Sequence, residues 1–155
     1  MNIALETPDQ PDVIALIAEL DVYQLTLYPP ESVFALDLAS LKQPNVVFAV
    51  ARDAAGSAIG CGAIVTGPEF GEIKRMYVRP EARGKGVAGR LLQLLEDEAA
   101  RRGVSLFTLE TGPYQMEALA LYKRKGYRRC ERFGDYPDDP YSVFMRKTLQ
   151  SHKVK

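Results

Sequence analysis

The chain has 155 residues and a mass of 17.2 kDa, and its 20 basic and 20 acidic side chains give no formal net charge. This length suits one domain with one core. The charge balance argues against a protein that binds nucleic acid or an anionic membrane, because such proteins usually carry a cationic excess. The longest apolar run, residues 46–51, is too short to cross a bilayer, and the N-terminus does not resemble a signal peptide, so we expect a cytoplasmic protein.

The first third of the chain predicts a short strand followed by two helices. Residues 2–6 are extended in character, and apolar side chains then recur at helical spacing through residues 11–27. Consecutive prolines at 29–30 end this helix, because proline cannot continue it. Residues 31–41 predict a second, shorter helix.

The rest of the chain alternates strand-like and helix-like patterns. Residues 46–52 and 58–66 predict a β-hairpin. The remaining expected elements are a strand at 72–79, a helix at 86–102, a strand at 104–111, a helix at 115–125, and strands at 127–133 and 141–147. The order β-α-α-β-β-β-α-β-α-β-β predicts one mixed α+β domain over residues 1–149, followed by a tail at 150–155 that we expect to fray.

Few residues are available for histidine or metal chemistry. The one histidine, His152, lies in the polar tail, and the two cysteines, Cys61 and Cys130, are far apart in the sequence. A catalytic triad would need a histidine base, and a zinc site would need a set of ligands that this chain lacks. We therefore expect no metal, and an enzyme with this sequence would use carboxylates, tyrosines and backbone amides.

A basic, glycine-rich segment connects the strand at 72–79 to the longest amphipathic helix. Residues 74–90 contain six basic side chains and one acidic side chain, a local charge of +6 − 1 = +5. Cations at a helix N-terminus oppose the helix dipole and cost about 0.3–1 kcal/mol each. They are useful there if an anion is bound, because the first N–H groups of a helix and the glycines before it form a phosphate site. The alternative is a solvated basic surface.

The same segment also fits a dinucleotide-binding motif. Gly84-x-Gly86-x-x-Gly89 has the glycine spacing of that motif, and Glu110 lies downstream at a suitable distance for a ribose contact. However, Arg79-Pro80-Glu81-Ala82-Arg83 stands before the first glycine, and Pro80 stops the strand. A β-hairpin precedes the motif where that fold requires βαβ units. An oxidoreductase is therefore the less favoured alternative.

Three segments resemble one known family. Arg83-Gly84-Lys85-Gly86-Val87-Ala88 resembles the Arg/Gln-x-x-Gly-x-Gly/Ala signature of the GCN5-related N-acetyltransferase (GNAT) superfamily. Residues 72–78 resemble the fourth strand of that family, and residues 118–127 resemble its closing helix and the strand after it. The resemblance implies an acyl-CoA N-acyltransferase fold and acetyl transfer from acetyl-CoA to the amine of a small molecule or peptide. A coenzyme-binding sensor without activity is the alternative within this fold.

The resemblance also implies where the coenzyme binds. The backbone of Met76, Tyr77 and Val78 would pair with the pantetheine arm, in a gap where the fourth and fifth strands of the family separate. Gln115 stands where many members carry an asparagine that contacts the coenzyme. The backbone amides expected to hold the pyrophosphate belong to Arg83, Gly84, Lys85, Gly86, Val87, Ala88 and Gly89.

The catalytic and acceptor residues follow from the same resemblance. Glu72 occupies a position where some relatives carry the general base, and Glu110 and a water molecule are the alternatives. Tyr122 stands where the family usually carries the tyrosine that protonates the departing thiolate. The expected acceptor groove lies between the first helices and the last hairpin, with Tyr28, Glu31, Glu110 and Tyr136 as its candidate residues. A homodimer is a further family-level expectation.

Overall fold

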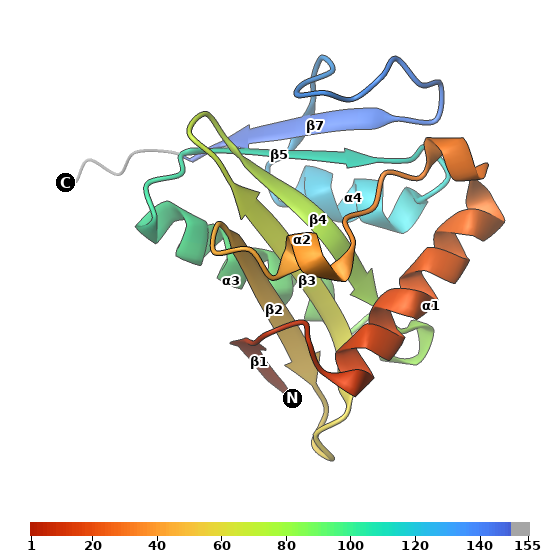
Figure 1. Cartoon of the computed structure of the whole chain (residues 1–155), viewed down its shortest axis with the longest axis vertical. Coiled ribbons are helices and arrows are strands. Elements are labelled where there is room, and N and C mark those ends of the chain that lie inside the picture. The colour runs from red at the N-terminus through yellow and green to blue at the C-terminus, as the bar shows by residue number, and fades with distance from the viewer. Residues whose placement is uncertain (150–155) are drawn as a thin grey trace.

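The computed structural model describes residues 1–149, and its elements follow the predicted order (Figure 1). The predicted tail, with His152, lies outside the described residues. Two short 3-10 helices, η1 and η2, accompany the expected elements. The bounds are β1 Asn2–Leu5, α1 Pro11–Leu27, η1 Pro30–Ser32, α2 Leu38–Leu41, β2 Val46–Arg52, β3 Ala58–Thr66, β4 Gly71–Val78, η2 Pro80–Ala82, α3 Val87–Arg101, β5 Leu106–Thr111, α4 Met116–Arg124, β6 Arg128–Arg129 and β7 Val143–Thr148.

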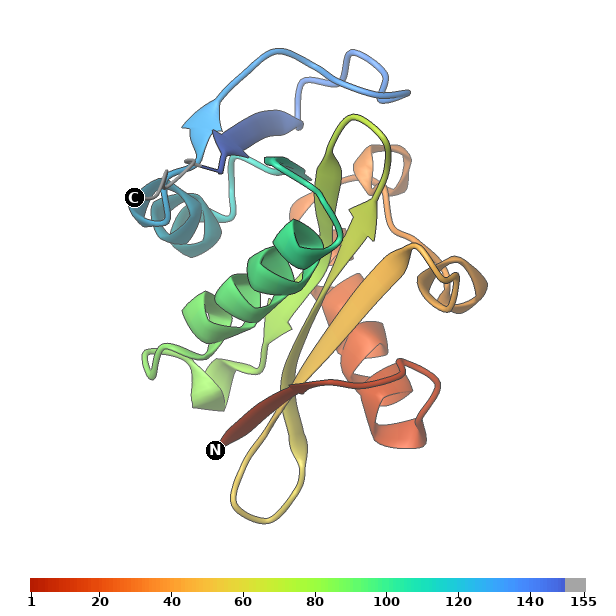
Figure 2. The same ribbon diagram turned by 90° about the vertical axis from the view of Figure 1, so that its left-hand side faces the viewer.

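The strands form one mixed sheet in the order β1-β2-β3-β4-β5-β7-β6. Every neighbouring pair is antiparallel except β4 and β5, which are parallel. Figure 2 shows α3 and α4 on one face of this sheet and α1 and α2 on the other. The predicted α+β class is therefore confirmed, and successive βαβ units, which a dinucleotide-binding fold requires, are absent from residues 1–149.

Two buried clusters hold the helices on the sheet. α3 contributes Leu91 and Leu95 to the first cluster, and both side chains are fully buried against the sheet. α1 contributes Val13, Leu16 and Leu20 to the second cluster. These residues lie three or four positions apart, so they occupy one helical face and bury it together.

The predicted helix at 31–41 is wrong as a continuous element. Only η1 and the single turn of α2 are helical, and residues 33–37 between them are not. Lys74 donates a hydrogen bond to the Phe34 carbonyl at 3.0 Å, and Arg75 donates to the Leu36 carbonyl at 2.9 and 3.1 Å. These carbonyl groups are therefore bonded to β4 instead of to a helical turn. Asp37 then caps α2 by accepting from the Ser40 N–H at 2.9 Å.

The predicted strand at 127–133 is shorter than expected. Of residues 127–133, only the two residues of β6 pair with β7, and the chain leaves the sheet after the Cys130 N–H donates to the Phe144 carbonyl. Phe133 then packs edge-on against Phe144 and Tyr136, with ring centroids 5.4 and 5.5 Å apart. Aromatic packing over the sheet therefore replaces strand pairing in this part of the chain. Among residues 1–149, no helix is long and apolar enough to cross a membrane.

Candidate functional site

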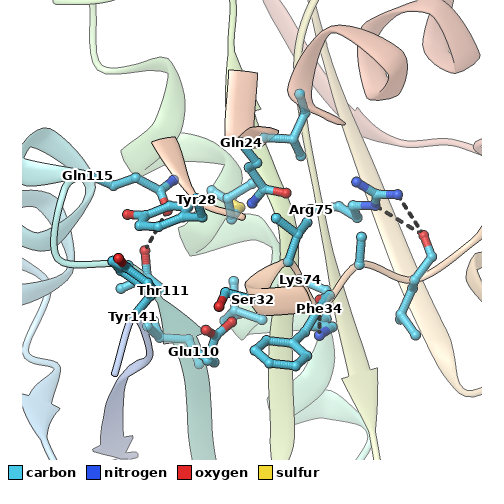
Figure 3. Close-up of a pocket in the computed structure, with 18 of the residues that line it drawn as sticks. Gln24, Tyr28, Ser32, Phe34, Lys74, Arg75, Glu110, Thr111, Gln115 and Tyr141 are labelled. Atoms are coloured by element: carbon cyan, nitrogen blue, oxygen red, sulfur yellow. Dashed lines mark hydrogen bonds between the residues drawn. The ribbon is translucent and has the colours of Figure 1, made fainter. Parts of the chain in front are cut away.

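Two hollows open where β4 and β5 separate. The two strands pair only between residues 71–73 and 107–109, and they diverge beyond that point. The glycine cleft, about 730 Å³, lies between the end of β4, the start of α3 and α4. The tyrosine cavity, about 70 Å³, lies on the other side, between α1, residues 32–36, β4 and the end of β5 (Figure 3). Both hollows are lined by Leu20, Met76, Gln115 and Tyr122, so this is where they meet.

A β-bulge in β4 shapes this junction. Cys61 pairs with Tyr77 and Ala63 pairs with Lys74, so one residue of β3 faces two residues of β4. One of these two is Arg75, whose φ of 59° is left-handed. A bulge bends a strand and redirects its side chains. The Arg75 side chain is buried, and its hydrogen bonds to Asp21 and to the Leu36 carbonyl hold this backbone conformation in place.

The glycine cleft presents a row of free backbone donors. Gly84 and Gly86 have φ values of 79° and 77°, and a Cβ at either position would meet no atom within 4 Å. Within residues 1–149, the six N–H groups of residues 84–89 donate no hydrogen bond. They stand at the positive end of α3, a 15-residue helix. This combination suits a phosphate or pyrophosphate group.

Arg83 closes one side of the glycine cleft. Its Nε donates to the Val78 carbonyl at 2.9 Å, and its guanidinium lies 5.7 Å from the Tyr23 ring and 5.9 Å from the Tyr77 ring. The cation therefore lies at the cleft wall, where it adds to the positive potential. Lys85 is exposed and is not one of the cleft-lining residues, so only its backbone N–H belongs to the row of donors.

Tyr122, in the last turn of α4, faces both hollows. Its side chain is 6% exposed, and its hydroxyl makes no hydrogen bond with any residue from 1 to 149. Burial raises the pKa of Tyr122, so the hydroxyl keeps its proton at neutral pH. The Gln115 side chain lies nearby and accepts a hydrogen bond from the Thr111 hydroxyl at 3.4 Å. The tyrosine therefore offers a free donor at the junction.

The two predicted carboxylates lie in different environments. Glu110 lines the tyrosine cavity, and its Oε2 accepts a hydrogen bond from the Ser142 hydroxyl at 2.9 Å. Burial raises the pKa of Glu110 to about 7. Glu72 lines neither hollow; it accepts a hydrogen bond from Tyr136 and lies 3.6 Å from the Lys74 ammonium. Of the two, only Glu110 can meet a ligand in the cavity.

Tyr136 anchors the loop between β6 and β7. Lys74 donates to its hydroxyl at 2.6 Å, and that hydroxyl donates to Glu72. Burial, and then the charge of Glu72, raise the pKa of Tyr136. A second tie joins the same loop to η1, because the Ser32 hydroxyl donates to Asp139 at 2.8 Å. Tyr136 thus holds the loop over the sheet and does not itself line the cavity.

Tyr28 lines the tyrosine cavity at the end of α1. Its hydroxyl accepts a hydrogen bond from the Tyr114 N–H at 3.1 Å and packs directly on Gly112, where any Cβ would collide with it. Its ring stacks on Tyr114 and lies 5.9 Å from the ring of Tyr141. The predicted neighbour Glu31 is exposed and lies outside the cavity lining.

Several residues of the cavity wall were not expected from the sequence. Lys74 and Arg75 were expected only as charges of the basic segment, although the spacing of Lys74 from Glu72 places both on one face of a strand. Tyr141 belongs to the last loop that was expected to wall the acceptor groove, whereas Ser142, which donates to Glu110, carries no local signal because its place depends on how this loop folds back over the sheet. Among residues 1–149, no group of three His, Cys, Asp or Glu side chains is placed to hold a metal ion.

The sequence matches a family model described as the acetyltransferase (GNAT) family over residues 13–127. It is 48% identical over 151 residues to a protein of Azospirillum brasilense named IAA acetyltransferase, a match that covers 96% of this chain and 98% of that one. The uncharacterised N-acetyltransferase YsnE of Bacillus subtilis is 39% identical over 153 residues, covering 96% of this chain and all of that protein.

Solved structures show the same similarity. A Klebsiella pneumoniae protein described as an acyl-CoA N-acyltransferase has a TM-score of 0.85 at 41% identity, with 96% of this chain and 97% of that chain covered. An N-acetyltransferase of Thermoplasma acidophilum in complex with coenzyme A has a TM-score of 0.72 at 17% identity, covering 96% of this chain and all of that one. The second similarity concerns the fold alone.

Proposed function

This chain belongs to the acetyltransferase (GNAT) family and is an acetyltransferase, and from that premise we propose that it transfers the acetyl group of acetyl-CoA to a primary amine of a small molecule or peptide. The observation that carries the proposal is the junction of the two hollows at Met76 and Tyr122. A coenzyme in the glycine cleft and an amine in the tyrosine cavity would meet there. The N-acetyltransferase names of the relatives support the amine as acceptor.

The residues of the glycine cleft fit coenzyme A. The free N–H groups of residues 84–89 would hold its pyrophosphate, with Arg83 beside them. The unpaired part of β4 at residues 76–78 would hold the pantetheine arm as an added strand would be held. When bound, acetyl-CoA supplies an activated thioester carbonyl, which a neutral amine can attack without further activation.

Glu110 is our candidate for the proton acceptor. An alkyl amine has a pKa of about 10.4, so roughly one molecule in 2,500 is neutral at pH 7. A carboxyl group whose pKa is about 7 can take up a proton efficiently near neutral pH. Glu110 also lines the cavity where the amine would bind, whereas Glu72 is engaged with Tyr136 and Lys74. We therefore assign to Glu110 the role of accepting the proton of the amine, and to Glu72 the role of holding the loop between β6 and β7.

Tyr122 is our candidate for stabilising the departing thiolate. A free thiol has a pKa of about 8.5 and a phenol about 10, so complete proton transfer from tyrosine to the thiolate is uphill. A hydrogen bond to the sulfur from the Tyr122 hydroxyl, which has no partner among residues 1–149, is the larger effect.

Release of free thiol from acetyl-CoA by the purified protein tests the function. We expect release that depends on an added amine, with the acetylated amine identified by mass spectrometry. IAA belongs in the acceptor panel because the Azospirillum brasilense relative is named for it. Tight coenzyme binding by calorimetry, with no acceptor that produces turnover, would favour the sensor alternative. The homodimer and the cytoplasmic location stay predictions.

A further inference from the structure

We propose that Arg124 and Lys125, at the C-terminal end of α4, bind the 3′-phosphate of the coenzyme. The protein would then distinguish coenzyme A from dephospho-coenzyme A, which lacks only this group. This inference rests on the proposed function, because it concerns the donor side of the same site. It adds two residues from another part of the chain to the phosphate site at residues 83–89.

Lys125 reaches from the end of α4 to the first turn of α3. α4 ends at Arg124, Lys125 is its C-cap, and Gly126 then turns the chain with a φ of 96°. The Lys125 side chain lies against Gly89, near the start of α3. Its Cε and Nζ are 3.1 and 3.4 Å from the point where a Cβ on Gly89 would stand. A side chain at position 89 would crowd Lys125, so the glycine lets the ammonium group approach the N-terminus of α3.

This position is electrostatically unfavourable for a cation unless an anion is bound. The C-terminal end of a helix favours basic residues, so the dipole of α4 accounts for the presence of Lys123, Arg124 and Lys125. It does not account for the place of the Lys125 ammonium group, because the N-terminus of α3 carries the opposite partial charge and repels a cation. The free N–H groups of residues 84–89 lie at this same end of α3. An anion that contacts both the N–H groups and the ammonium group would remove the conflict.

No carboxylate compensates these two charges. Within residues 1–149, Arg124 and Lys125 form no ion pair. The other charged side chains that line the glycine cleft, Arg83 and Glu117, lie 3.9 Å apart and offset each other. Arg124 lines the cleft, and Lys125 lies against Gly89, which also lines it. Two uncompensated positive charges therefore remain beside the phosphate site.

The covalent structure of coenzyme A brings its 3′-phosphate close to these charges. The pyrophosphate and the 3′-phosphate are attached to the same ribose, so they lie within the length of one sugar of each other. With the pyrophosphate on the N–H groups of residues 84–89, the 3′-phosphate is within reach of the side chains of Arg124 and Lys125. A phosphate monoester carries a charge of about −1.5 to −2 at pH 7. Two basic side chains can neutralise it through charge-assisted hydrogen bonds.

Calorimetry with coenzyme A and with dephospho-coenzyme A tests the inference on the full chain. We expect the Kd to be at least tenfold lower for coenzyme A, and the difference to narrow as the salt concentration rises, because salt screens ionic contacts. Equal Kd values for the two ligands would overturn the inference and leave the proposed function standing. No binding of either ligand would overturn both. The expected preference, combined with no amine that produces turnover, would support the inference and overturn the proposed function alone.

A double variant, Arg124→Gln with Lys125→Gln, gives the second arm of the test. It removes both charges and keeps much of the side-chain bulk. The Kd for coenzyme A should rise at least fivefold, while the Kd for dephospho-coenzyme A stays within twofold. Lys123→Gln is the matched control, because Lys123 is a basic residue of the same last turn of α4 but does not line the cleft, and it should change neither Kd. An equal rise for both ligands in the double variant would mean that the two cations serve the pyrophosphate or the fold, and would overturn the inference. An equal loss of coenzyme A affinity in Lys123→Gln would overturn it as well.

Discussion

Replacing Glu110 by glutamine should remove most of the activity and one limb of the pH profile. If Glu110 accepts the proton, the wild-type kcat/KM should fall as the pH drops through about 7. It should reach about a tenth of its plateau one unit below that pKa. The variant keeps the size and one hydrogen-bonding oxygen of the side chain but cannot take up a proton. We expect a loss of about 100-fold or more at pH 8.

The same substitution should affect stability with a definite sign. Burial raises the pKa of Glu110 from 4.5 to about 7, which corresponds to about 3 kcal/mol. The folded state therefore holds this proton more tightly than the unfolded state does. The stabilisation is present below pH 4.5 and is lost as the pH rises to 7, after which the buried charge costs its full amount. Glu110→Gln should gain about 2 kcal/mol relative to the wild type between pH 5 and pH 8.

Two measurements decide between Glu110 and Glu72. The first is the pH dependence of kcat/KM for two amines of different pKa. The apparent pKa of an enzyme group is the same with both amines, whereas an apparent pKa that belongs to the amine differs between them. The second is urea unfolding at pH 5 and pH 8. Glu72→Gln is the matched control and should lower kcat/KM less than fivefold. A limb near pH 7 that persists in Glu110→Gln, or a larger loss in Glu72→Gln, would contradict the assignment.

Three further substitutions test other parts of the site. Gly86→Asp should weaken coenzyme binding more than tenfold in calorimetry, because it adds a negative charge to the phosphate site. Gly56→Asp is the control, since Gly56 has the same left-handed backbone in the β2–β3 turn, and this variant should bind the coenzyme normally. Equal losses of affinity in both variants would refute the placement of the phosphate site. Tyr122→Phe should lower kcat at least tenfold without changing the free energy of unfolding. Tyr127→Phe removes a buried hydrogen bond to Glu96 at 2.7 Å, so it should lower the free energy of unfolding by about 1–3 kcal/mol and leave kcat unchanged. Tyr136→Phe should raise the acceptor KM severalfold and leave the coenzyme KM within twofold, and an equal rise in both would mean that the loop is not specific to the acceptor side.

Elements with strong local patterns were predictable from the sequence. The helix predicted at 11–27 has the same bounds in the structure, because its apolar period and its flanking prolines are local signals. The strands at 46–52 and 58–66 are confirmed for the same reason. The interruption of the helix predicted at 31–41 could not be predicted from the sequence. It is caused by hydrogen bonds from Lys74 and Arg75 of β4, which are distant in the sequence and hold residues 33–37 out of a helix.

The two halves of the site differ in the same way. The glycine segment is contiguous, so its capacity for left-handed backbone conformations and its positive charge are both visible in the sequence. The roles of Glu72 and Glu110 depend on which side chains come to lie against them from other segments. Tyr136 reaches Glu72 across 64 positions, and Ser142 reaches Glu110 across 32. Both carboxylates were therefore predictable as candidates, but which of them lines the cavity was not.

The extra residue in β4 resets the alternation of that strand. Ile73 and Val78 both face the α3 side of the sheet, although they are five positions apart and an unbroken strand would turn them to opposite sides. Tyr77 accordingly packs with the α1 cluster. Deleting Arg75 or Met76 would restore regular alternation and keep Tyr77 and Val78 on their present faces, but it would remove the bend of β4 where the two hollows meet. A further inserted residue would instead turn Tyr77 and Val78 to the opposite faces, so the length of this segment fixes which layer each of them joins.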